Sequence, residues 1–125
     1  MTILLDLPMT LVRACSPNKR QHHMVLAKNK SALKDYVQWT LRTERHPTYD
    51  APTIHLFAIG KKRWDPDNLV AACKAAIDAF EAEGIVTNDQ HIQLGTVRSI
   101  AWPKGVRRQL HWTDPDRVCI RLEPE

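Results

Sequence analysis

One stretch of the sequence carries clear signals for where a helix begins and where it ends. Its apolar residues recur at helical spacing, at Leu69, Val70, Cys73, Ala76, Ile77 and Phe80. Asp65 is a good N-cap, Pro66 suits the first helical position, and Gly84 is a natural C-terminal stop. The first element that we predict is therefore a helix from Pro66 to Glu83, and the segments around it have to pack against its apolar stripe.

Shorter apolar segments on both sides of this helix predict strands. They are residues 3–11, interrupted by Pro8, and residues 53–59, 92–102, 106–112 and 118–122. A second helix is predicted at residues 31–45, with Ser31 as its cap and an apolar stripe of Leu33, Val37 and Leu41. Residues 16–30 are basic and lack periodicity, which predicts a loop. The chain fits one domain, residues 1–125, of the α+β class, with a small mixed β-sheet and two main helices.

Positive charge is gathered in three groups along the chain, and the formal net charge is +4. The groups are residues 18–23 with Lys28 and Lys30; Lys61, Lys62 and Arg63; and Lys104, Arg107 and Arg108. A solvated surface explains any one group alone. Three groups together, one of them directly before a carboxylate segment, favour a face that binds nucleic-acid phosphates. The candidate DNA-binding residues are Lys19, Arg20, Lys61, Lys62 and Arg63.

The cysteines and the apolar runs exclude several other classes of protein. The three cysteines, Cys15, Cys73 and Cys119, are an odd number without Cys-x-x-Cys spacing, which argues against a disulfide framework and a zinc site. Cys73 lies in the apolar stripe, so we expect a buried thiol. The first residues lack a basic leader, and no apolar run approaches a membrane span. We expect a soluble, cytoplasmic protein without a small-molecule cofactor.

The segment Asp65-Pro66-Asp67-Asn68 has two interpretations. Locally it is a good helix start, and the similar Asp114-Pro115-Asp116 is interpreted as a turn. At 100° per residue, however, Asp67, Lys74 and Asp78 would share the helix face opposite the apolar stripe. Such a row is explained by ion pairing between Lys74 and Asp78, or by a metal ligand beside a phosphate-binding cation. A later carboxylate, Asp89, opens the next predicted strand.

The order and spacing of these residues resemble a known family. Residues 63–68, then Lys74 and Asp78, then residues 84–92 are similar to the pattern of the RusA family of Holliday junction resolvases. That pattern is Asp-x-Asp-Asn, a helix carrying Lys and then Asp four residues on, and an Asp-Asp pair opening the next strand. The resemblance covers the central third of the chain. Residues 16–20 loosely resemble the early Pro/Asn/basic segment of the same family.

The resemblance implies a homodimeric endonuclease that resolves four-way DNA junctions by paired nicks in recombination and repair, in bacterial or phage-infected cytoplasm. It implies that Asp65, Asp67 and Asp89 bind Mg²⁺ or Mn²⁺ and that Lys74 is the essential lysine. Two residues depart from the pattern. The usual lysine position is Ala71 here, with Lys74 one turn later, and the first residue of the Asp-Asp pair is Asn88.

The predicted helix raises a problem of reach for Asp89. Residues 66–83 would span about 27 Å as one helix, whereas residues 84–89 span at most roughly 20 Å when extended. Either the helix is shorter or bent, or Asp89 acts in the site of a second subunit. Two other functions stay open: a non-catalytic DNA-binding protein, in which the aspartates only cap and turn, and a nuclease that prefers flap or fork DNA.

Overall fold

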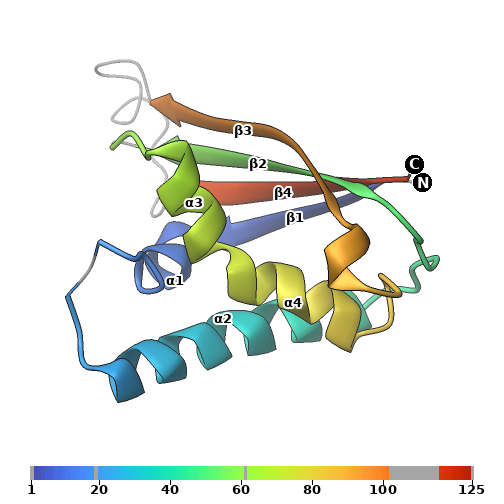
Figure 1. Cartoon of the computed structure of the whole chain (residues 1–125), viewed down its shortest axis with the longest axis horizontal. Helices are drawn as coiled ribbons and strands as arrows, with labels where there is room; N and C mark the ends of the chain where they lie inside the picture. Colours follow the sequence, from blue (N-terminus) through green and yellow to red (C-terminus); the bar gives the residue numbers. More distant parts are fainter. Residues whose placement is uncertain (1, 19, 61, 102–115, 125) are drawn as a thin grey trace.

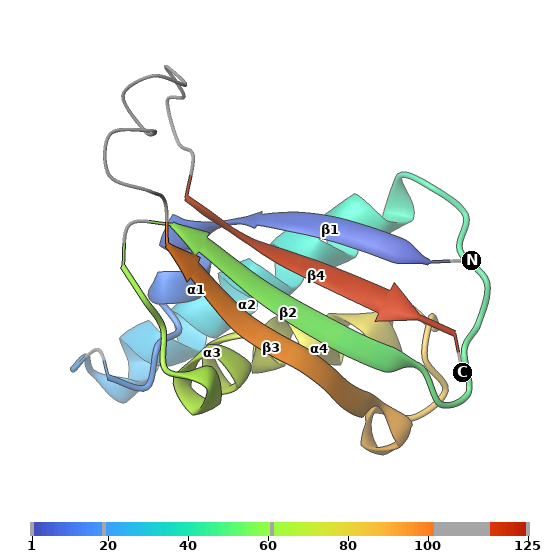
Figure 2. The ribbon, with the colours of Figure 1, turned by 90° about the horizontal axis from the view of Figure 1, so that it is seen from above.

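A four-stranded mixed sheet forms one layer of the molecule, and the helices cover one of its faces (Figures 1 and 2). The computed structural model describes residues 2–18, 20–60, 62–101 and 116–124. Its elements are β1 (Ile3–Pro8), α1 (Met9–Arg13), α2 (His23–Arg42), β2 (Thr53–Gly60), α3 (Pro66–Ala72), α4 (Lys74–Ala82), the 3₁₀ turn η1 (Asp89–His91), β3 (Gln93–Ala101) and β4 (Arg117–Glu123). The α+β prediction is confirmed, with four α-helices in the described ranges where two main ones were predicted.

The strand order is β1-β4-β2-β3, with β2 and β3 parallel and the other neighbours antiparallel. Alternate residues of β1, β2 and β4 point into the core. This alternation of buried and exposed positions is the pattern that predicted these strands from the sequence. The helices close this core with Leu33, Val37 and Leu41 of α2 and with the fully buried Phe80 of α4. No helix in the described ranges combines the length and the apolar character needed to cross a membrane.

Two predictions for the N-terminal third are wrong. The strand predicted at residues 3–11 ends at Pro8, and α1 follows because Met9 and Val12, three residues apart, are both buried. The loop predicted at residues 16–30 is helical from His23. The cap of α2 is His22, whose Nδ1 accepts a hydrogen bond from the Met24 backbone N–H at 3.2 Å, rather than Ser31. The first turns of α2 are exposed, so no apolar stripe marked them in the sequence.

The predicted helix of residues 66–83 is divided at Cys73 into α3 and α4. The backbone torsions of Cys73 are φ −88° and ψ −1°. The Cys73 N–H donates to both Leu69 O (3.0 Å) and Val70 O (3.2 Å). The division follows the packing, because α3 contacts β2 and β3 whereas α4 contacts α2. The predicted stop at Gly84 is confirmed, since its φ of 72° is a left-handed conformation that glycine adopts readily.

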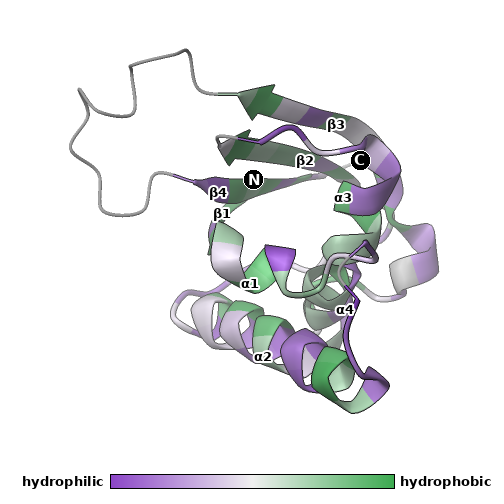
Figure 3. Ribbon diagram, turned by 90° about the vertical axis from the view of Figure 1, so that its left-hand side faces the viewer, coloured by the Kyte–Doolittle hydropathy of each residue, from purple (hydrophilic) through white to green (hydrophobic). Residues whose placement is uncertain are grey.

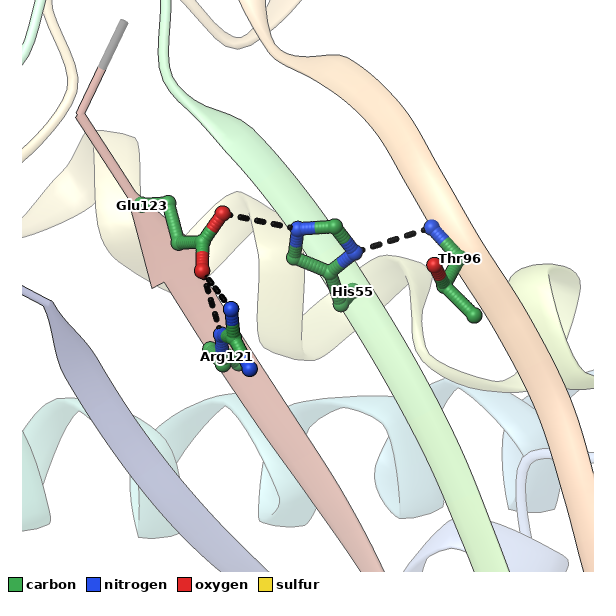
Figure 4. A network of polar contacts seen from close by, with 4 residues as sticks. All are labelled: His55, Thr96, Arg121 and Glu123. Atoms are coloured by element: carbon green, nitrogen blue, oxygen red, sulfur yellow. Dashed lines mark hydrogen bonds and ion pairs between the residues drawn. The ribbon is translucent and has the colours of Figure 1, made fainter.

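A polar network on the open face of the sheet fixes the pairing of β2 with β3 (Figure 4). Nδ1 of His55 accepts a hydrogen bond from the Thr96 backbone N–H at 2.9 Å, and Nε2 lies 3.1 Å from Glu123, which is also paired with Arg121. The register of β2 and β3 shifts at this point. A Cβ on Gly95 would lie only 2.5 Å from Cε1 of His55, so the ring requires a glycine there.

We predict that Gly95→Ala lowers the free energy of unfolding by about 1–3 kcal/mol, because the added methyl meets a ring held on both sides. Urea unfolding measures the change. In a His55→Ala background the cost of Gly95→Ala should fall, since the ring is gone. An unchanged wild-type stability would contradict this account of the strand pairing.

Candidate active site

A cleft of about 490 Å³ opens where α1 ends, β2 ends and α3 begins. Its lining comes from two distant parts of the sequence: Arg13, Ser16, Asn18, Lys62, Arg63, Trp64, Asp65 and Asn68. The lining residues thus include three cationic side chains and one carboxylate. Figure 3 looks at this end of the molecule, where α1 lies between α2 and the sheet. The balance of charge favours an anionic ligand such as a phosphate group.

Asp65 is held in place by its neighbours on both sides. Its Oδ1 accepts hydrogen bonds from the backbone N–H groups of Asp67 (2.9 Å) and Asn68 (3.4 Å), so it is the N-cap that the sequence predicted. The preceding Trp64 donates its backbone N–H to Ser99 Oγ on β3 at 2.8 Å. The acidic segment is thus fixed between the end of β3 and the first turn of α3.

The N-terminal side of the cleft is a tight turn after α1. Ser16 is buried, and its Oγ accepts a hydrogen bond from the Asn18 backbone N–H at 3.3 Å. Side chains of Gln21 and Asn29 donate to Ala14 O at 2.8 and 3.3 Å, which ties this turn to α2. Asn68 belongs to the segment that the sequence singled out, whereas Arg13, Ser16 and Asn18 were not predicted as lining residues. The weak resemblance at residues 16–20 was the one signal pointing there.

Lys74 and Asp78 lie on a different surface from Asp65. They line a groove between α2 and α4, where Lys74 Nζ is 3.9 Å from Asp78 Oδ1. The change of direction at Cys73 is the reason, because the 100° rotation per residue that aligned Asp67 with Lys74 applies only along one continuous helix. Lys74 and Asp78 thus share a surface as predicted, whereas Asp67 lines neither the groove nor the cleft, and the catalytic role of Lys74 stays a prediction.

The backbone of Asp89 lies at the other end of the sheet from Asp65. Asp89 opens η1, just before β3, and Gln93 at the start of β3 pairs with Thr53 at the start of β2. Asp65 instead follows the end of β2 and is anchored near Ser99. Six strand residues separate Gln93 from Ser99, which is about 20 Å. One chain thus does not bring these two positions together; the side chain of Asp89 lies outside the described structure.

The other predicted DNA-binding residues are divided between described and undescribed positions. Lys62 and Arg63 line the cleft, and Arg20 is exposed without lining it. Lys19 and Lys61 lie outside the described residues. So do the third basic group, the strand predicted at residues 106–112, and Asp114 with Pro115.

The described residues offer an incomplete set of metal ligands. No group of three or more His, Cys, Asp or Glu residues comes together among them in a way that would hold a metal ion. Asp65 and Asp67 do start from neighbouring positions in the first turn of α3. Mg²⁺ is commonly held by one or two carboxylates, with waters and substrate phosphate oxygens as the other ligands. Two carboxylates of this kind suit such an ion, which would take its other ligands from water and from a substrate phosphate.

The three cysteines are free thiols, and none is placed to act as a nucleophile. Cys73 is buried as predicted, and desolvation raises its pKa to about 12. Burial also raises the pKa of Cys15 and of Cys119. Because the thiolate is the reactive form, thiol chemistry is disfavoured at all three positions.

Comparison with known proteins finds no family model and no curated protein that matches this chain. Any functional assignment therefore depends on the residues and on their geometry.

The hydrogen bonds by which Asp65 caps α3 lead to a prediction about stability. Asp65→Ala removes the cap of α3 and should lower the free energy of unfolding by about 1 kcal/mol, whereas Asp65→Asn keeps an equivalent cap and should cost much less. Urea unfolding of both variants tests this, with Asp67→Asn as a control whose side chain makes no capping bond. Equal losses for the Ala and Asn variants at position 65 would show that the cap contributes little.

Proposed function

We propose that this protein is a divalent-metal-dependent DNA endonuclease of the Holliday junction resolvase type, acting as a RusA-like homodimer on four-way junctions. The observation that carries the proposal is the cleft, which Arg13, Lys62 and Arg63 line together with Asp65 and Asn68 of the acidic segment. Arg13, from the end of α1, thus lines the same cleft as Asp65 and Asn68, which belong to the first part of the motif. In this proposal the protein works in the cytoplasm of a bacterial or phage-infected cell, where recombining DNA is found.

Each group in the cleft has a role that follows from its chemistry. Arg13, Lys62 and Arg63 bind backbone phosphates and hold the scissile phosphodiester against Asp65. The cap bonds keep the Asp65 carboxylate oriented before DNA arrives. Asp65 and Asp67 would hold Mg²⁺ or Mn²⁺, which supplies charge neutralisation at the phosphodiester and a means of activating the attacking water. Trp64, half-buried beside Asp65, offers an aromatic surface for an unstacked base.

The third aspartate enters this proposal from a second subunit. One chain keeps Asp89 at the far end of the sheet, so a site with Asp65, Asp67 and Asp89 requires two chains. A two-fold symmetric pair then has two equivalent sites, as two symmetric nicks require.

A non-catalytic DNA-binding protein is the second candidate, and one observation favours it. Asp65 already satisfies two backbone N–H groups of α3, so helix capping alone explains its presence. In that case the cationic residues of the cleft bind phosphates and no bond is cut. A nuclease that prefers flap or fork DNA is distinguished by assaying those substrates beside the four-way junction.

We predict that Asp67→Asn reduces Mg²⁺-dependent cleavage of a synthetic four-way junction by on the order of a hundredfold or more, because a metal ligand is lost. Binding of the same junction in the absence of divalent metal should be retained. Asp50→Asn, at an exposed carboxylate before β2, is the matched control and should cleave normally. Unchanged cleavage by Asp67→Asn would place the metal site elsewhere.

Mixing two inactive variants tests the shared site. If Asp89 acts in the partner's cleft, a heterodimer of Asp67→Asn and Asp89→Asn contains one site with every native aspartate, so nicking should reappear. If all three aspartates act within one chain, both sites stay defective. Nicking of a labelled junction, measured after the variants are denatured and refolded together, separates the two cases, with each variant refolded alone as the control. Absence of nicking in the mixture would refute the shared site.

A further inference from the structure

The N-terminal part of the chain is long, basic and free of acidic residues. From Leu7 through Lys34 the sequence contains six Lys and Arg residues, Lys34 included, and no Asp or Glu, although the whole chain has fourteen acidic residues. This segment forms the end of β1, α1, the turn that lines the cleft, and the first half of α2. A surface built from it has no carboxylate of its own to neutralise it.

The segment connects the cleft to the groove between α2 and α4. Arg13 lines the cleft at one end. Lys30 lies near the turn after α1, where burial raises the pKa of Cys15 and the Lys30 ammonium opposes that rise. Lys30 and Lys34 then line the groove, facing Lys74 across it. We call Arg13, Lys30, Lys34 and Lys74 the basic track.

The groove is hollowed enough to receive a ligand. It holds two hollows of about 420 and 280 Å³ that share Lys34, Lys74 and Asp78, and Glu81 lines the larger one. The side chain of Lys74 is 72% exposed and lies 3.9 Å from Asp78. An exposed ion pair at this separation is weak. Lys74 can therefore exchange its carboxylate partner for an anionic ligand at little cost.

We propose that the basic track binds the phosphate backbone of a DNA duplex arm leaving the cleft, and that Lys74 contacts a phosphate there rather than at the scissile bond. The proposal rests on the proposed function, because it takes DNA as the substrate. Lys30 and Lys34 are one helical turn apart, about 6 Å along α2. Phosphates of one DNA strand recur every 3.4 Å along the axis, so two such lysines can follow a single strand.

The test compares two variants with the same loss of charge. Lys30→Gln/Lys34→Gln removes two cations from the track. Arg45→Gln/Arg98→Gln removes two exposed cations that line neither the cleft nor the groove and belong to none of the three basic groups. Binding of a blunt DNA duplex and of a four-way junction is measured without divalent metal, from 50 to 200 mM salt. Thermal melting first establishes that both variants are folded.

The slope of log affinity against log salt is negative, and in the track variant it should be about 1.8 less steep than in the native chain. This change corresponds to about 0.9 for each of the two phosphate contacts removed. Between about 50 and 200 mM salt the native chain should lose affinity by a factor about 12 times larger than the factor lost by the track variant. The control variant should keep the native slope. Equal slopes for the two variants, or binding of anionic lipid vesicles in place of DNA, would overturn the proposal.

The outcome is separable from that of the proposed function. A native chain that binds duplex DNA with the track-dependent slope but cuts no junction supports the track and refutes the nuclease. A native chain that cuts junctions while both variants share one slope refutes the track and leaves the nuclease in place.

Discussion

The parallel pairing of β2 with β3 decides how far apart Asp65 and Asp89 lie in one chain. Parallel neighbours need a crossover that returns the chain to the starting end of the sheet, and α3, α4 and η1 form that crossover. The residues that leave β2 and those that enter β3 are consequently held at opposite ends. Asp65 belongs to the first set and Asp89 to the second. Shortening or bending the helix cannot remove this separation, because the strand pairing itself imposes it.

The sequence predicted the fold where one face of an element is buried. β2 and β4 alternate cleanly between core and open face, and the buried stripe of α2 was found at Leu33, Val37 and Leu41. The first turns of α2 and the short α1 were missed, because the former are exposed and the latter offers only two buried positions. Their structure is set instead by the His22 cap and by side chains bonded to Ala14, which no periodicity reveals.

The candidate site was predicted in part, for a related reason. Local signals placed Asp65 at the start of a helix, and its cap geometry is as predicted. The approach of Arg13, Ser16 and Asn18 depends on how α1 packs against α2 and β4, which are tertiary contacts without a local signal. Of the cationic lining residues, Arg13 comes from tertiary structure, whereas Lys62 and Arg63 precede the acidic segment in the sequence. Asp65 caps the first turn of α3 and also lines the cleft, so one side chain contributes to helix stability and to the charge of the cleft.

The single-residue joint at Cys73 changes what a spacing in the sequence measures. Along one unbroken helix, the number of residues between an aspartate and a lysine specifies both a distance and a direction. Across the joint, the same count combines two axes, one set by the sheet beneath α3 and the other by the packing of α4 on α2. A sequence pattern that requires a fixed number of residues between the aspartate and the lysine would exclude a chain in which the lysine comes one turn later and the helix bends between the two residues. Such an arrangement is better described by two separate constraints than by one continuous motif. One is the packing of α3 on the sheet, and the other is the packing of α4 on α2.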